Sequence, residues 1–185
     1  MTAVRDSLAV MKKYRDTAPV DVFAIARDLG VDVIKVPMPR NISGIIRRKD
    51  HSSFEILVNS PHALVRQRFT VAHELGHCIY HRDLLGDGVG DTLAYRADDA
   101  ELPPNRKIKL EHEWQANTFA ANLLMPKALI ETLQGQGIRS TAALADRLQV
   151  SEEALKIRLG MVVRDDVREP GGDVEISRPT EAHGI

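Results

Sequence analysis

Cysteine is nearly absent from this 185-residue sequence, which contains Cys78 alone. An intramolecular disulfide is therefore excluded, and the composition gives no sign of a secreted, cross-linked scaffold. Positive charge is not in excess either, because 25 Lys and Arg residues stand against 26 Asp and Glu residues. A broad basic surface for nucleic-acid phosphates is thus not expected, and direct nucleic-acid binding is disfavoured.

Long apolar runs are also missing. No stretch approaches the roughly 18 apolar residues of a membrane span, and the charged N-terminal residues 1–17 lack the apolar core of a signal peptide. The 43% of hydrophobic residues in a chain of this length instead predict a globular protein with a sizeable core. We expect it to be cytoplasmic and to have no membrane partner.

The first 81 residues contain helical and strand patterns that alternate. Apolar residues at helical spacing predict two short helices before Gly30, and β-branched runs predict strands at 31–36, 42–47 and 54–58. These strands should form a small, mainly antiparallel sheet. Ser60 and Pro61 match a helix N-cap followed by proline at the first helical position, which predicts one long helix from there to about His81.

The second half of the chain is predicted to be helical after a long connection. Residues 82–109 are rich in Gly, Asp and Pro, and we expect a mobile flap without regular structure beside the active-site cleft. Helices follow at 110–124, 140–148 and 151–159. We therefore divide the chain into a main domain at 1–130, a helix-turn-helix-like segment at 131–160 and a flexible tail at 161–185.

The long helix contains an H-E-x-x-H motif, His73-Glu74-Leu75-Gly76-His77. Two histidines four residues apart lie one turn apart on the same helix face, so both imidazoles can reach one metal ion. Glu74 is placed to take a proton from zinc-bound water rather than to bind the metal. The motif therefore predicts a zinc site with a general base beside it.

A catalytic zinc ion usually takes three protein ligands, so one more is needed. The helix from Leu110 offers Glu113, with small residues on the same side that allow a close approach, and Asn117 one turn on could hydrogen-bond a histidine ring from behind. His81 and His112 are rival third ligands. His81 would have to bend back to the metal, so a supporting role at the helix end suits it better.

The blocks Arg68 to His77 and Glu113 to Pro126 together resemble the ImmA/IrrE family of metallopeptidases, and the resemblance extends over roughly residues 20–159. It implies an α+β, zincin-like metallopeptidase domain with a small sheet and two ligand helices, followed by the helix-turn-helix-like segment. It also implies a thermolysin-like site with Zn²⁺ held by His73, His77 and Glu113 and with Glu74 as base.

The same resemblance implies a substrate. Relatives cleave a helix-turn-helix repressor of the Xre or cI type and so release the genes that it silences, and others are encoded in toxin-antitoxin-like pairs. We therefore expect a cytoplasmic zinc endopeptidase whose partner is such a repressor. A non-catalytic protein that sequesters a repressor or toxin is the alternative, and Glu74→Gln separates the two.

A DNA-binding regulator is a third interpretation, because residues 144–159 resemble a helix-turn-helix. Its second helix begins with Glu152 and Glu153, which DNA phosphates would repel, so packing or partner docking is favoured. Elsewhere we expect Trp114 and Phe119 to be core aromatics and Cys78 to be a small core residue. The sequence leaves the group that stabilises the oxyanion open among these residues: Tyr80, Tyr95, Arg96 and His112.

Overall fold

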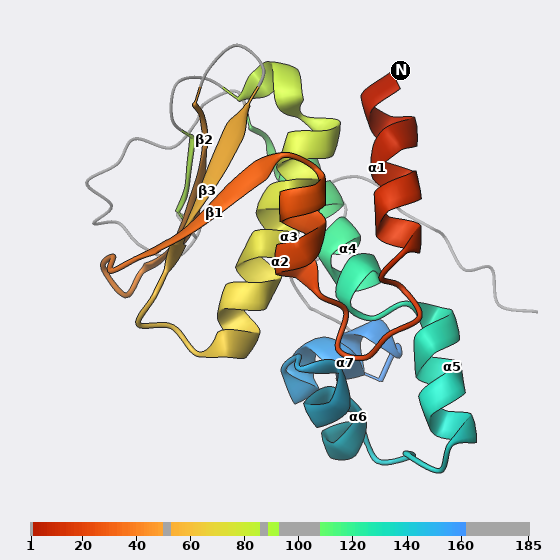
Figure 1. Ribbon diagram of the computed structural model, residues 1–185. Helices are drawn as coiled ribbons and strands as arrows, with labels where there is room; N and C mark the ends of the chain where they lie inside the picture. The colour runs from red at the N-terminus through yellow and green to blue at the C-terminus, as the bar shows by residue number, and fades with distance from the viewer. Residues whose placement is uncertain (1, 50–52, 86–88, 93–107, 162–185) are drawn as a thin grey trace, which may run out of the picture.

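The computed structural model describes residues 2–49, 53–85, 89–92 and 108–161, and it has the α+β architecture that the sequence predicts (Figure 1). In chain order the elements are α1 (Thr2–Lys12), α2 (Val22–Asp28), β1 (Val31–Val36), β2 (Ile42–Arg48), β3 (Phe54–Asn59), α3 (Leu64–Tyr80), the 3-10 turn η1 (Arg82–Leu84), β4 (Val89–Thr92), α4 (Leu110–Leu124), α5 (Lys127–Gly135), α6 (Thr141–Leu148) and α7 (Glu152–Arg158).

The sheet has the strand order β1-β3-β2-β4. Strand β1 runs parallel to β3, whereas β2 is antiparallel to both β3 and β4, so the expectation of a mainly antiparallel sheet is confirmed. Apolar side chains from the strands, including Ile46, Phe54 and Ile56, are buried under the helices. The register between β2 and β4 shifts between Ile42 and Gly44, as at a β-bulge.

Helix α3 lies between the sheet and α4, and it contacts β2 and β3 on one side and α4 on the other (Figure 1). Three of its apolar residues are fully inaccessible to solvent: Val71, Ala72 and Leu75. Because α3 is enclosed on two sides, the polar residues of the same helix are buried as well. This placement brings the H-E-x-x-H motif into the interior.

The start of α3 differs from the sequence prediction. Ser60 and Pro61 belong to a turn, and the helix begins only at Leu64, after an N-cap residue, Ala63, that has no side-chain hydrogen bond. The physical reason is Gln67, whose amide donates to the carbonyls of Ser60 and His62 at 3.1 and 2.6 Å. These bonds satisfy the turn, so the chain does not need to continue the helix backward.

The predicted structure of residues 82–109 is wrong where the structure describes it. Residues 82–84 form the turn η1, and residues 89–92 form β4 at the edge of the sheet. The reason is tertiary, because the edge of β2 offers backbone groups that a Gly- and Asp-rich segment can pair with. The rest of the proposed flap, at 86–88 and 93–107, lies outside the described residues.

The C-terminal helices pack on the same core as α3. The structure adds α5, which the sequence reading does not predict, and it places the two later helices close to their expected positions, each beginning at a serine N-cap: Ser140 and Ser151. Leu144, Leu148 and Leu155 are fully buried in one cluster with the core of the sheet and α3. None of the helices in the described part of the chain has the length and apolar character that a bilayer crossing requires.

Candidate metal centre

The two histidines of the motif face each other at the same side of α3, as their spacing predicts. His73 and His77 are 5% and 3% exposed, and their Nε2 atoms are 3.0 Å apart. Two ring nitrogens that converge at this distance need a proton or a cation between them, because their lone pairs otherwise repel. The pair therefore has the chemistry of a cation site.

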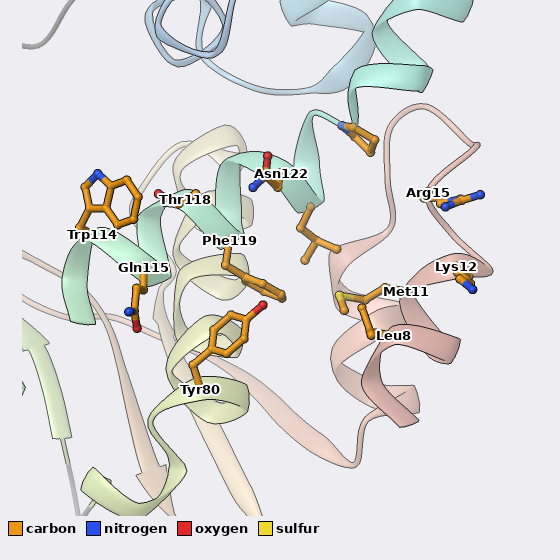
Figure 2. A pocket seen from close by; sticks show the side chains of 12 residues that line it. Leu8, Met11, Lys12, Arg15, Tyr80, Trp114, Gln115, Thr118, Phe119 and Asn122 are labelled. Carbon is orange, nitrogen blue, oxygen red and sulfur yellow. The ribbon is translucent and has the colours of Figure 1, made fainter. Parts of the chain in front are cut away.

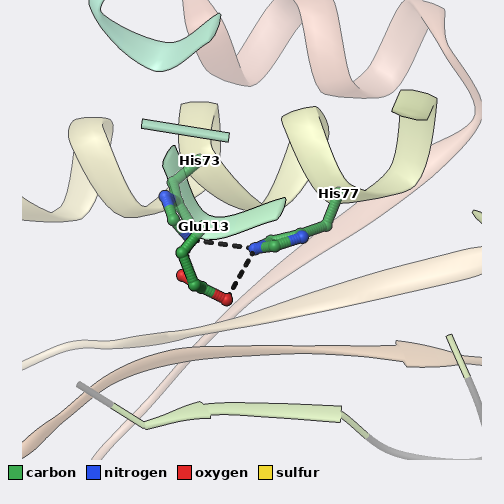
Figure 3. Close-up of side chains that lie close together, drawn as sticks. All are labelled: His73, His77 and Glu113. Carbon is green, nitrogen blue, oxygen red and sulfur yellow. Dashed lines mark hydrogen bonds and ion pairs between the residues drawn. The ribbon is translucent and has the colours of Figure 1, made fainter. Parts of the chain in front are cut away.

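The third member of the cluster, Glu113, comes from the first turn of α4. Its carboxylate oxygens lie 3.3 Å from His73 Nε2 and 3.4 Å from His77 Nε2 (Figure 3). Ligands at 2.0–2.1 Å from a tetrahedral ion are separated by about 3.3–3.4 Å. The two Glu113 contacts thus match the spacing around a small tetrahedral ion, and the 3.0 Å between the imidazole nitrogens is somewhat shorter; the residue types present fit such an ion. Their role as ligands stays a prediction.

A contact between small residues sets the distance between the two ligand helices. A Cβ atom added to Gly76 would lie 3.1 Å from the Ala116 Cα atom and 3.1 Å from a ring carbon of Phe119. Gly76 is next to His77 in α3, and Ala116 is one turn beyond Glu113 in α4. The close approach of these two backbones therefore carries Glu113 to within reach of the imidazoles.

The charge state of Glu113 suits metal binding. Burial raises the pKa of this carboxyl, but hydrogen bonds and charges from His73 and His77 outweigh burial and lower the pKa to about 2. The group is consequently an ionised carboxylate at neutral pH. An anionic oxygen beside two imidazoles is a donor set that divalent transition metals prefer.

Asn117 contacts the first histidine from behind. His73 Nδ1 donates to the Asn117 side-chain oxygen at 3.1 Å, a contact between α3 and α4. A neutral His73 ring with its proton on Nδ1 directs the lone pair of Nε2 at the cluster, as metal binding would require. This is the contact expected from the position of Asn117 one turn after Glu113.

The rival ligands lie elsewhere. His81 is buried, but its Nδ1 atom is 3.0 Å from Nδ1 of His77, on the side of that ring that faces away from the cluster. Burial lowers the pKa of His81, although Gln115 opposes the effect through a hydrogen bond. His112 Nδ1 accepts from the backbone N–H of Lys109 and so caps α4. Among the described residues, the group that could hold a metal ion is therefore His73, His77 and Glu113.

Glu74 is fully buried between the ligand helix and the sheet. A Cβ atom on Gly44 of β2 would lie 3.8 Å from Glu74 Oε1 and would collide with the Thr70 methyl group. The missing side chain at Gly44 therefore leaves room where β2 passes the carboxylate. A glycine within a predicted strand is the sequence signal for this close approach, and the prediction of the site does not include it.

A pocket of about 580 Å³ opens between α1 and α4, beside the metal centre rather than at it (Figure 2). The expectation that Trp114 belongs to the core is wrong, because it is 58% exposed on the outer face of α4, whereas Phe119 is buried as expected. Tyr80 lines the same pocket with its ring edge-on to Phe119. Of the other oxyanion candidates, His112 caps α4, and Tyr95 and Arg96 lie outside the described residues.

Cys78 is a buried residue of the core, as predicted. Burial raises the pKa of its thiol to about 11, with a small opposing effect from Arg82 and Arg48. The thiolate population at neutral pH is thus very small, and a redox role is disfavoured.

Comparison with known proteins gives a consistent result. Residues 26–160 match the model of a peptidase family described as the IrrE N-terminal-like domain. The chain is 36% identical over 159 residues to the radiation response metalloprotease IrrE of Deinococcus radiodurans, covering 79% of this chain and 44% of that protein. It is 40% identical over 99 residues to the protein of the same name from Deinococcus deserti, covering 52% of this chain and 32% of that protein. The chain thus spans less than half the length of these curated relatives.

A solved structure shares the fold. The Mycobacterium tuberculosis transcriptional regulator superposes with a TM-score of 0.53 over 87% of this chain and 48% of the other, at 19% sequence identity. At that identity the likeness concerns the fold alone. It agrees with the α+β architecture.

Proposed function

This chain belongs to the peptidase family defined by the IrrE N-terminal-like domain, and from that premise we propose that it is a cytoplasmic zinc-dependent endopeptidase. The observation that carries the proposal is the convergence of His73, His77 and Glu113 at mutual distances of 3.0–3.4 Å. Two imidazoles and one carboxylate are the ligand set of thermolysin-type zinc sites.

Each residue around the centre has a separate proposed role in the reaction. His73, His77 and Glu113 would hold the ion, which when bound supplies a Lewis acid that polarises the scissile carbonyl and makes water more acidic. Glu74, adjacent to His73 on α3, takes the proton from the attacking water and later delivers it to the leaving amine. Asn117 keeps the His73 ring oriented through its hydrogen bond.

The proposed substrate is a helix-turn-helix repressor of the Xre or cI type, recognised as a folded protein. Helix α7 supports this choice, because its first turn is acidic: Glu153 is exposed, and Glu152 pairs with Lys156 at 2.9 Å. An acidic edge complements the basic DNA-binding face of a repressor. Such complementarity mainly sets the rate of encounter and the choice of partner. The same acidity disfavours direct DNA binding by α6 and α7.

The test is to incubate the zinc-loaded protein with the helix-turn-helix repressor encoded nearest to its gene, and separately with unfolded casein. We expect cleavage of the repressor at one or a few bonds, and loss of that cleavage in Glu74→Gln. Cleavage of casein with the repressor left intact would remove the proposed substrate but keep the peptidase. Tight repressor binding without cleavage, unchanged in Glu74→Gln, would overturn the peptidase in favour of a sequestering protein.

A further inference from the structure

The two histidines of the centre are supported in different ways. His73 donates to an amide oxygen, that of Asn117, whereas Nδ1 of His77 faces a second imidazole, that of His81, at 3.0 Å. An amide oxygen always accepts a hydrogen bond. A neutral imidazole nitrogen accepts only when the proton of its own ring is on the other nitrogen.

The contacts around His81 allow one arrangement of protons that leaves His77 able to bind a metal. His77 Nε2 must present a lone pair to the cluster, so its proton is on Nδ1 and is donated to Nδ1 of His81. The proton of His81 must then be on Nε2, and this atom lies 2.8 Å from the side-chain oxygen of Gln115, which accepts it. Each donor in the series faces an acceptor.

We propose that His81 is a positioning residue that selects the metal-binding tautomer of His77, with Gln115 fixing the tautomer of His81 in turn. The inference rests on the proposed function only in that His77 is taken as a metal ligand. The series Gln115-His81-His77 connects the surface of α4 to the interior of α3, since Gln115 is exposed and lines the pocket of Figure 2.

The backbone holds His81 firmly enough for this role. It is the C-cap residue of α3, and its N–H donates to the carbonyl of His77 at 2.8 Å. Its ring is also enclosed, because the centroid of the His112 ring is 4.6 Å away. His81 is only 5% exposed, so water has little access to replace its ring as the acceptor for His77.

The opposite tautomer shows why the selection matters. If His81 carried its proton on Nδ1, it would donate to His77, and the proton of His77 would move to Nε2, between the ring and the ion. Zinc would then have to displace that proton before binding. Hydrogen-bond partners behind a ligand histidine typically change metal affinity by about 10–100-fold when they are removed.

The experiment compares two variants of the buried His81 with one of the exposed Gln115. His81→Leu removes the acceptor and should weaken zinc binding about 10–100-fold in competition with a chromophoric chelator. His81→Asn places a carbonyl oxygen near the position of Nδ1 and should recover most of that affinity. Gln115→Ala should have the smallest effect, because Gln115 is exposed and water can accept from His81 in its place.

Nuclear magnetic resonance supplies a readout that does not depend on activity. Two-bond ¹⁵N–¹H correlations of the zinc-loaded wild-type protein should show the proton of His77 on Nδ1 and that of His81 on Nε2, and a His81 proton on Nδ1 would contradict the series. Equal zinc affinity in His81→Leu and the wild type, or no recovery in His81→Asn, would overturn the proposal.

The two proposals fail separately. A wild-type chain that binds zinc and cleaves neither the repressor nor casein would contradict the peptidase, while the tautomers and zinc affinities would still decide the role of His81. A wild-type chain that binds no zinc would end the proposed function. It would also end the inference, which takes His77 as a metal ligand, whereas unchanged zinc affinity in His81→Leu with cleavage intact would overturn the inference alone.

Discussion

Helix α3 and the pair α6–α7 contrast in what they bury. Helix α3 and its C-cap residue bury seven polar side chains: Gln67, Arg68, Thr70, His73, Glu74, His77 and His81. The pair α6–α7 buries only Leu144, Ala145, Leu148 and Leu155. Buried polar groups cost stability unless they are paired, whereas buried leucines contribute stability directly.

The difference separates two uses of a helix in the same core. On α3 the buried polar groups are held by partners from other elements, such as Asn117 from α4 for His73 and the carbonyls of Val20 and Gln149 for Arg68. On α6–α7 the charged groups are exposed or half-buried: Glu152 pairs with Lys156 within α7, and Arg147 and Arg158 donate to the carbonyls of Ala18 and Met125. The same substitution should therefore change chemistry on α3 and only stability or docking on α7.

The sharpest test applies one chemical change in both regions. Glu74→Gln should lower kcat for repressor cleavage by about 10²–10⁴-fold, because it removes the general base while keeping the size of the side chain. Glu153→Gln, on the exposed first turn of α7, should leave kcat unchanged and alter the free energy of unfolding by less than about 0.5 kcal/mol. Similar losses of kcat in both variants would contradict the contrast.

Metal removal should destabilise the protein, because the proposed ion would connect α3 to α4. A bound ion at 100 times its dissociation constant adds about 2.7 kcal/mol to the free energy of unfolding. EDTA should therefore lower the Tm of the wild type, and His73→Ala and Glu113→Ala should contain little zinc by elemental analysis and show no response to EDTA. His112→Ala is the control, and loss of its zinc would transfer the third-ligand role to His112.

The contact between the ligand helices should be intolerant of size. Gly76→Leu must displace Ala116 and Phe119, so we expect a loss of about 1–3 kcal/mol in the free energy of unfolding, with weaker zinc binding. Gly135→Leu in α5 is the matched control, because a Cβ atom there meets nothing within 4 Å. Chemical denaturation measures both, and equal stabilities would show that the helices can move apart freely.

The smallest expected effect compares two serines that both precede a helix in the sequence. Ser151 accepts from the N–H of Ala154 at 3.1 Å, so Ser151→Ala should cost about 1 kcal/mol of the free energy of unfolding. Ser60 lies in the turn before α3, where Ala63 is the N-cap residue. Ser60→Ala should therefore lower the free energy of unfolding by less than Ser151→Ala does. A larger loss in Ser60→Ala would indicate that Ser60 is the N-cap residue, as predicted from the sequence.

The parts of the fold that follow from local chemistry are predictable from the sequence. The strand Val31–Val36 and the helix Leu110–Leu124 have the expected limits, because β-branched residues and helical periodicity agree there with the tertiary structure. Helix α5 was missed because Pro126, the stop signal of α4, is also its N-cap residue. Strand β4 could not be predicted from its glycines and aspartates, because pairing with β2 defines it.

The candidate site divides in the same way. The i, i+4 spacing within α3 places His73 and His77 on one face, and it also places His81 one turn beyond His77. The contact with Gln115 depends instead on how α4 packs against α3, which no local pattern encodes. The exposure of Trp114 has the same origin, because periodicity shows that a residue is apolar but not which neighbour will cover it.

The close contact of Gly76 with Ala116 also bears on which metal ion the proposed centre would prefer. The ligand atoms belong to two different helices, so the diameter of the ion that they can enclose depends on the thickness of the two side chains between the backbones. Gly76 has no side chain and Ala116 has only a methyl group, so the two backbones are close to their nearest possible approach. A thicker spacer, such as serine in place of Ala116, would draw Glu113 away from the imidazoles and favour a larger cation. Gly76 and Ala116 would thus limit the size of the bound ion without contacting it.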